Sequence, residues 1–438
     1  MKEVLLSSLE AGTTTIQEYF TREGAVLIPS GTLLSQEYLE KMKARGIETV
    51  YSKEIQTPEL KEDIEEIYKK ARLPELAGIK RGKEGLIQLI KSNKGTDLDS
   101  LIKDGKNPDK PSGPMLKDSA RQVTNGERSA QYKESIKDMY QRAFLRIRTI
   151  LDSLAEGELV SAEAVRSISC QFVNVFLTDR DILLNISGTK PSEGDYVYHH
   201  SLNVCILSIC IAASFGYNEQ QIIEIGMGAL LHDAGMLLVP KDVRYKNEQL
   251  DEDDWSELRK HPILGLHLID KIKGLPESVP IVVYQSHERD NGKGYPRMRS
   301  SKMIHNYARI VSIADVYEAL TSPRVYHDAN IPYKAMETIV KLTRQGIISG
   351  EYAKAFLECM SLFPVGSVVE LSNKCIGKVV RANPASFSKP VVSVITDPKG
   401  EILPENRICF EDLSKNTNLQ IVRAYPASVL NADMMLGF

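Results

Sequence analysis

The sequence of 438 residues has no surplus of basic residues, no closely spaced cysteine pair and no apolar run long enough to cross a membrane. Its formal net charge is −3, whereas proteins that bind nucleic acid or anionic membranes in general carry excess positive charge. We therefore expect no binding of DNA or RNA and no insertion into a membrane. A ligand that carries phosphate groups must then be bound by local positive side chains or by metal ions.

The six cysteines include no CxxC pair, and several lie within apolar runs, which is typical of buried free thiols. The first ten residues lack the apolar stretch and the basic flank of a secretory signal. The most apolar segment, 202–215, is shorter than a membrane-spanning helix and contains Asn203 and Ser208, so we expect a buried helix there. Together these features predict a cytoplasmic protein with reduced cysteines.

Length and patterning predict a mainly α-helical chain with a small module at each end. A chain of this length is expected to form two to four domains. Composition divides it into an α/β module with a regulatory or dimerising role (1–55), a helical segment (56–94), a flexible linker rich in Gly, Pro, Lys and Asp (95–130), a helical metal-binding domain (131–363) and a small β-rich module (364–438). A homodimer is left open.

The elements within these parts follow from the spacing of apolar residues. Alternation with turn residues predicts strands at 13–20, 25–28 and 48–51, and in the last module at 367–371, 377–382, 390–396 and 419–424. A helix is predicted at 35–45 between Ser35 and Gly46. Spacing of three and four predicts further helices at 139–154, 162–176, 202–215, 221–231, 253–260, 263–271, 279–287, 307–320 and 335–343.

Histidine and aspartate residues occur where these apolar helices begin, end or turn inward. The doublet His232-Asp233 follows an amphipathic helix, and Asp315 interrupts an apolar run in which an unpaired carboxylate would be costly. Imidazole nitrogens and carboxylate oxygens together form sites for first-row transition metals. An Asp that directly follows a His can bridge two metals, and a metal pair is a device for cleaving phosphate esters. The remaining candidate ligands are His200, His261 and His287.

The order of these residues resembles that of the HD-GYP family, over about residues 195–360. The motifs that carry the resemblance are His200-Ser201-x-x-Val204, His232-Asp233-x-Gly235, His261-Pro262, His287-Glu288-Arg289 with Gly294-Tyr295-Pro296, Arg309-Ile310 before Asp315, and Ala319-Leu320-Thr321-Ser322-x-Arg324-x-Tyr326. The resemblance implies a helical HD-type domain that hydrolyses cyclic di-GMP to linear pGpG, GMP or both, with two or three iron or manganese ions.

The resemblance also assigns roles to individual residues. It places one metal on His200, His232, Asp233 and Asp315, and it makes Asp233 the bridge to a second metal on His261 and His287. Tyr196 stands where members with three metals have a Glu, which favours two ions. Asp233 and Arg289 are the predicted catalytic residues. The predicted substrate-binding residues are Arg289, Gly294, Tyr295, Pro296, Arg324 and His327.

Two positions depart from the family's pattern at the reaction centre. Met236 replaces a lysine placed to meet the phosphate, and a thioether offers no hydrogen-bond donor. Ser286 replaces the first of two consecutive histidines, which weakens the second metal site. The active phosphodiesterase is our preferred hypothesis. The alternative is a catalytically impaired member that binds cyclic di-GMP, or a signalling protein partner, as an effector.

Overall fold

The computed structural model of the chain describes residues 2–6, 19–22, 26–28, 36–44, 47, 49–52, 63–102, 111, 113–116, 129–186, 195–246, 248–322, 332–383, 386–404, 407–416 and 418–425. The chain divides into two compact units, residues 1–60 and residues 61–438. The predicted fold class, mainly α with a small module at each end, is confirmed.

The N-terminal unit is a small antiparallel sheet with one helix. Its strands, in the order β1-β4-β2-β3, are β1 (Lys2–Leu5), β4 (Thr49–Ser52), β2 (Tyr19–Phe20) and β3 (Val26–Ile28), and the helix is α1 (Gln36–Ala44). Leu39 and Met42 of the helix pack with Ile28 and Val50 in a small apolar core. Strand β1 was not predicted from the sequence, and 13–18 of the predicted first strand lie outside the described residues.

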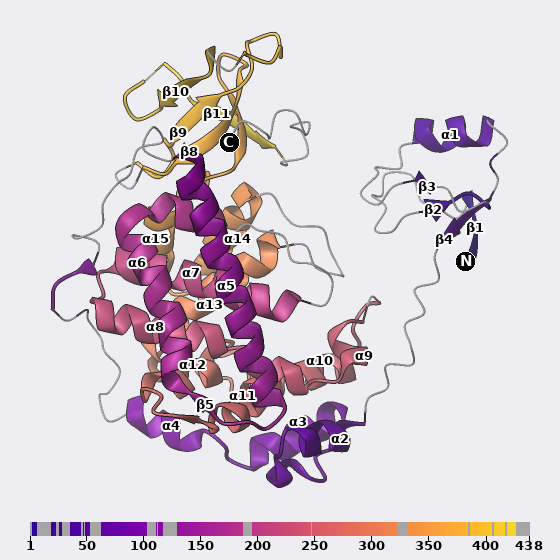
Figure 1. Ribbon diagram of the computed structural model, residues 1–438, viewed down its shortest axis with the longest axis vertical. Coiled ribbons are helices and arrows are strands. Elements are labelled where there is room, and N and C mark those ends of the chain that lie inside the picture. The colour runs from indigo at the N-terminus through magenta and orange to yellow at the C-terminus, as the bar shows by residue number, and fades with distance from the viewer. Residues whose placement is uncertain are drawn as a thin grey trace. The chain divides into compact units, whose positions relative to one another are not determined.

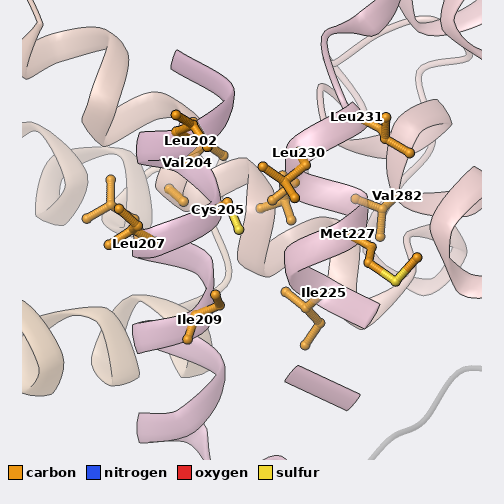
Figure 2. Packing of buried hydrophobic residues seen from close by; sticks show 14 of the residues in the cluster. Leu202, Val204, Cys205, Leu207, Ile209, Ile225, Met227, Leu230, Leu231 and Val282 are labelled. Carbon is orange, nitrogen blue, oxygen red and sulfur yellow. The ribbon is translucent and has the colours of Figure 1, made fainter. Parts of the chain in front are cut away.

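The helical domain is built around the apolar helix α7 (Tyr196–Phe215), which packs against α6, α8, α13 and α15 (Figure 1). Figure 2 shows apolar side chains of α7 and α8 facing each other, Cys205 and Leu230 among them. The other long helices are α5 (Ala130–Ala155), α6 (Ala162–Ile186), α8 (Glu219–Leu231), α12 (Ser278–Gln285), α13 (Asn306–Thr321), α14 (Pro332–Arg344) and α15 (Gly350–Met360). A short parallel pair, β5 (Val160–Ser161) and β6 (Ile272–Lys273), joins two loops.

Helix α7 is longer than predicted because it starts six residues earlier, at Tyr196. At 20 residues it is long and apolar enough to cross a membrane by length and composition, but 94% of its apolar window is buried inside the protein. The prediction of a buried helix is therefore confirmed, although its predicted length was too short.

Glycines in α8 let neighbouring helices approach closely. A Cβ added at Gly228 would lie 2.8 Å from two carbons of Val282, on the adjacent helix α12. This is closer than real Cβ contacts allow, so only glycine fits. The close contact brings the end of α8, where His232 and Asp233 follow, beside the end of α12, where His287 follows two residues later.

Residues 63–102 form a helical layer, α2 (Ile64–Lys70), α3 (Gly82–Lys91) and α4 (Thr96–Leu101). Helix α4 corrects the prediction that the chain from 95 onwards is a flexible linker. Its Asp99 is buried, where it forms an ion pair with Arg299 and accepts a hydrogen bond from Gln285. These partners are far along the chain, so composition alone could not indicate them. Of the rest of the predicted linker, 103–110, 112 and 117–128 lie outside the described residues.

The connection between α8 and α11 differs from the prediction at one functional residue. The short helices α9 (Lys241–Arg244) and α10 (Glu252–Leu258) precede α11 (His261–Ile269), so His261 is the first residue of a helix that was predicted to start at 263. Pro262 explains the boundary, because proline is favoured in the first turn of a helix.

The C-terminal module is a five-stranded antiparallel sheet in the order β10-β9-β8-β7-β11. Its strands are β7 (Val368–Leu371), β8 (Ile376–Arg381), β9 (Val391–Val394), β10 (Cys409–Asp412) and β11 (Ile421–Tyr425). Alternate residues such as Val369, Val379 and Val392 fill its core together with Phe363. Four of the strands were predicted, and β10 was not.

Candidate metal centre

Three histidines from different helices share one orientation, in which Nδ1 is tied to an oxygen of the protein. His232, which caps α8, places Nδ1 2.8 Å from the carbonyl oxygen of Ala229. His261 places Nδ1 2.7 Å from the carbonyl oxygen of Leu258. His200, on α7, places Nδ1 2.5 Å from Oε2 of Glu318. Each of these oxygens can only accept, so each Nδ1 donates, and each Nε2 is left to face the centre, where it can offer a lone pair to a cation.

The three Nε2 atoms converge on the carboxylate of Asp233. His261 Nε2 lies 3.2 Å from Oδ1, His232 Nε2 lies 3.5 Å from Oδ1, and His200 Nε2 lies 3.5 Å from Oδ2. All three are buried, and none has a hydrogen-bond partner among the residues that the structure describes. Lone pairs of nitrogen that face lone pairs of oxygen repel one another unless a cation lies between them. The donor set therefore fits metal ions, and such histidines ordinarily bind metal through one nitrogen while the other donates.

Asp315 and His287 complete the cluster. Asp315 places Oδ1 3.4 Å from His200 Nε2 and Oδ2 3.4 Å from His287 Nδ1. His287 Nε2 lies 3.1 Å from Asp233 Oδ1. The structure thus brings together all six residues predicted as metal ligands from sequence.

Two overlapping groups have ligand atoms within 4.8 Å of one another. One is His200, His232 and Asp315, and the other is His232, Asp233 and His287. The first agrees with the predicted first metal. The second group contains Asp233 and His287, which were predicted to bind the second metal, together with His232. His261 is not in this group, but its Nε2 lies 3.2 Å from Asp233 Oδ1. The two groups share His232, and each is a candidate metal-binding group.

The electrostatics of the cluster favour ionised carboxylates. Burial alone would raise the pKa of Asp233, but the surrounding imidazoles, His232 and His261 first, outweigh it and hold the pKa well below its ordinary value. The pKa of Asp315 is lowered in the same way by His200 and His287. Burial would lower the pKa of His200, yet the carboxylates around it, led by Glu318, raise it to about 10. Asp233 and Asp315 are therefore ionised, as carboxylate ligands of a metal must be.

Glu318 lies beside the candidate ligands, although the sequence motifs gave no indication of it. Its side chain is 4% exposed and accepts hydrogen bonds from His200 Nδ1, from Asn203 Nδ2 at 3.2 Å and from Ser322 Oγ at 2.5 Å. Asn203 is in turn fixed by Tyr140, whose hydroxyl donates to Asn203 Oδ1 at 2.9 Å. The available signal was the spacing of three from Asp315 on one helix, which places both side chains on one face.

The Gly294-Tyr295-Pro296 loop forms one wall of the centre. The ring of Tyr295 stacks on His287 with centroids 5.0 Å apart and an angle of 4°, and it meets His261 edge to face. A Cβ at Gly294 would lie 2.4 Å from Arg289 N and 2.5 Å from His287 O, so a side chain there cannot be accommodated. Glu288 supports the loop by accepting hydrogen bonds from the backbone N–H groups of Arg297 and Arg299.

Arg289 supports the ligands from within the protein. Its Nη1 donates to the carbonyl oxygens of Ser286 and Glu288 and to Ser312 Oγ, and its Nη2 lies 3.8 Å from Asp315 Oδ2. Arg289 thus contacts the backbone on both sides of His287 and the candidate ligand Asp315. Its predicted role in catalysis and substrate binding stays a prediction. The other two predicted substrate-binding residues, Arg324 and His327, lie outside the described residues.

The positions that depart from the family's pattern lie at the centre or directly beside it. Ser286 precedes His287, is fully buried, and its Oγ has no hydrogen-bond partner in the described part of the chain. Met236 is half-buried, and its backbone N–H donates to Asp233 O. Tyr196, which stands where a third metal would need a Glu, stacks on His200 with its hydroxyl 3.2 Å from Nδ1.

Comparison with known proteins agrees with this site. Residues 192–348 match the profile of the HD domain family, and residues 368–431 match a KOW domain associated with HD domains. Residues 192–348 are an HD domain of the HD-GYP family. The second match coincides with the sheet β7–β11.

Three bacterial relatives are similar to parts of the chain. One is cyclic di-GMP phosphodiesterase PA4108 of Pseudomonas aeruginosa, 29% identical over 50% of this chain and 52% of that protein. Another is cyclic di-GMP phosphodiesterase PdeB of Borreliella burgdorferi, 25% identical over 51% of this chain and 59% of that protein. A third is 3'3'-cGAMP-specific phosphodiesterase 2 of Vibrio cholerae, 26% identical over 34% of this chain and 29% of that protein. The chain spans about half the length of the first two relatives.

Proposed function

We propose that the protein is a metal-dependent phosphodiesterase that hydrolyses cyclic di-GMP to linear pGpG, GMP or both. The observation that carries the proposal is the convergence of three buried Nε2 lone pairs on the carboxylate of Asp233. The names of the relatives add the substrate class, because they are phosphodiesterases of cyclic dinucleotides.

The side chains of the centre would hold two iron or manganese ions with Asp233 between them. Such a metal pair polarises a phosphodiester, lowers the pKa of water and neutralises the charge that develops during in-line displacement. Glu318 keeps the proton of His200 on Nδ1, so that Nε2 is available as a ligand. Arg289 holds Asp315, and Tyr295 covers the face of His287. Preorganised side chains of this kind need no rearrangement when the substrate arrives.

The alternative is a catalytically impaired protein that binds cyclic di-GMP or a signalling partner. Met236 and Ser286 support it, because both lie at the reaction centre and neither supplies the group that the family's pattern has there. The loss of one donor to the transition state costs roughly a hundred- to thousandfold in rate.

The two functions are separated by measuring metal content and cyclic di-GMP turnover with iron(II) or manganese(II). Asp233→Asn is the matched negative control, because it keeps the shape of the side chain and removes the bridging charge. Turnover by the wild type that is lost in Asp233→Asn supports the enzyme. Tight nucleotide binding without turnover refutes the enzyme in favour of the binder. Recovery of turnover by Met236→Lys with Ser286→His would then trace the impairment to these positions.

We also propose that the protein works in the cytoplasm. Its six cysteines are free, and five of them are at least partly buried, as in proteins of reducing compartments. A homodimer and a signalling partner remain predictions that oligomeric-state and pull-down measurements can address.

A further inference from the structure

The single tryptophan of the chain, Trp255, lies on helix α10 with 49% of its surface exposed. Four residues later, at the C-terminal cap of the same helix, lies the exposed residue Arg259. Residues four apart share one face of a helix, and the Arg259 guanidinium carbon lies 6.0 Å from the centroid of the Trp255 ring.

Arg259 links this exposed tryptophan to the metal centre. Its guanidinium carbon is also 6.0 Å from the centroid of Tyr295, the aromatic residue of the loop beside the metal ligands. Tyr295 is in turn stacked on His287 at 5.0 Å. A continuous row of planar groups therefore runs from the candidate ligand His287 through Tyr295 and Arg259 to an exposed indole.

The guanidinium of Arg259 has no hydrogen bond and no ion pair within the described ranges of the chain, and its contacts are with the two aromatic rings. A basic residue at a helix C-terminus is favourable in any protein, and an isolated exposed tryptophan is also ordinary. Neither explanation accounts for an unpaired guanidinium between two aromatic rings beside a metal centre. Such a group has a planar fork of donors free for a phosphate, and an indole face binds nucleobases by stacking.

We propose that Trp255 and Arg259 form a subsite for the part of cyclic di-GMP that is not being cleaved, with Trp255 stacking on a guanine base and Arg259 binding a phosphate. This rests on the proposed function and specifies how its substrate is held. The reacting phosphodiester lies at the metal centre, so the rest of the ring-shaped dinucleotide must extend beyond it. The row through Tyr295 leads to a surface whose chemistry matches a purine and a phosphate.

The test uses the fluorescence of Trp255, which reports on this position alone because the chain has no other tryptophan. Cyclic di-GMP is mixed with the full-length, metal-loaded protein, and tryptophan emission is recorded by stopped flow before turnover. Equilibrium dialysis of the same metal-loaded protein, under conditions in which no product is detected, gives the affinity independently. The expected result is saturable quenching at the concentrations at which dialysis detects binding.

Variants test the energetic part of the proposal. Removing one base-stacking aromatic side chain costs affinity by about 5- to 150-fold, which is the loss expected for Trp255→Ala. Trp255→Phe keeps an aromatic face and should recover most of the affinity. Arg259→Ala should weaken binding and reduce its salt dependence. Phe387→Ala, which removes an aromatic side chain of similar exposure, 47%, from the C-terminal module, is the matched control and should bind as the wild type does.

The failure of this inference is distinguishable from the failure of the proposed function. If dialysis detects binding but Trp255 emission does not change, and Trp255→Ala and Arg259→Ala bind with unchanged affinity, the subsite is refuted while the proposed function stands. If dialysis detects no binding of cyclic di-GMP, both are overturned. Because these are binding measurements, they give an answer whether or not the protein is catalytically active.

Discussion

Replacing Glu318 by Gln should weaken metal binding although the residue is not predicted to touch a metal. Glu318 accepts three hydrogen bonds: Oε2 serves His200 Nδ1, and Oε1 serves Asn203 Nδ2 and Ser322 Oγ. Glutamine has one acceptor oxygen and one NH₂ group in place of the two oxygens. If its oxygen serves Asn203 and Ser322, its NH₂ group faces the Nδ1–H of His200, and two donors meet.

The repulsion between these two donors is removed when the proton of His200 moves from Nδ1 to Nε2. Nε2 is the atom that lies 3.5 Å from Asp233 and 3.4 Å from Asp315, so the proton would occupy the place of a metal bond. Loss of such an outer partner typically costs 10- to 100-fold in metal affinity, which corresponds to about 1.4–2.8 kcal/mol. The loss of one hydrogen bond to a charged group, about 1.5–3 kcal/mol, gives a similar figure.

The assay is titration of metal-depleted protein with manganese(II) against a competing chelator, with bound metal quantified by elemental analysis. Glu358→Gln is the control, because Glu358 lies on an exposed face of α15 with its side chain 42% exposed. Thermal unfolding of the metal-free proteins checks that both variants are folded. An unchanged manganese affinity in folded Glu318→Gln would refute the assigned role of Glu318 in holding the His200 tautomer.

Two further predictions concern the supports of the centre. Gly294→Ala should destabilise the protein by about 1–3 kcal/mol or more and lower its metal content, because the added Cβ would meet backbone atoms at 2.4–2.5 Å. The control is Gly350→Ala, because the nearest atom to its added Cβ would be 3.9 Å away. It should change neither the unfolding midpoint nor the metal content. Lys260→Met should cost about 3–5 kcal/mol in chemical denaturation, because it leaves Glu257 as an unpaired charge in a fully buried pair. Lys354→Met at an exposed pair should change stability by less than about 0.5 kcal/mol, and an equal loss in both lysine variants would contradict this reasoning.

The buried ion pair of Lys260 with Glu257 also shows how the layer α2–α4 is attached to the site. Lys260 directly precedes the candidate ligand His261, and its ammonium group donates to Glu257 and to the carbonyl oxygen of Lys80. Glu257 in turn accepts from the backbone N–H of Gly82 at 2.6 Å. The helical segment between the N-terminal unit and the HD domain is thus bonded to residues beside the metal centre.

Much of the helical domain could be predicted from sequence because its helices are strongly apolar and periodic. Errors occurred where partners are distant in the chain. Helix α4 was taken as linker because its polar composition hides the buried pair of Asp99 with Arg299, 200 residues later. The contacts of Arg289 could not be predicted either, because its place in the motif gave no information on where its guanidinium points. In the structure it contacts Ser312 and Asp315 of α13.

The residues of the candidate metal centre could be named from the sequence alone, because the types and order of its six His and Asp residues resemble the motifs of a known family. How these residues are held, and what surrounds them, depends on the folded chain. Glu318 meets His200 across 118 residues of chain, and Arg259 reaches Tyr295 from a different helix. Such contacts depend on the packing of helices against one another, and packing depends on all the side chains of the core together. No pattern within one segment could have specified them.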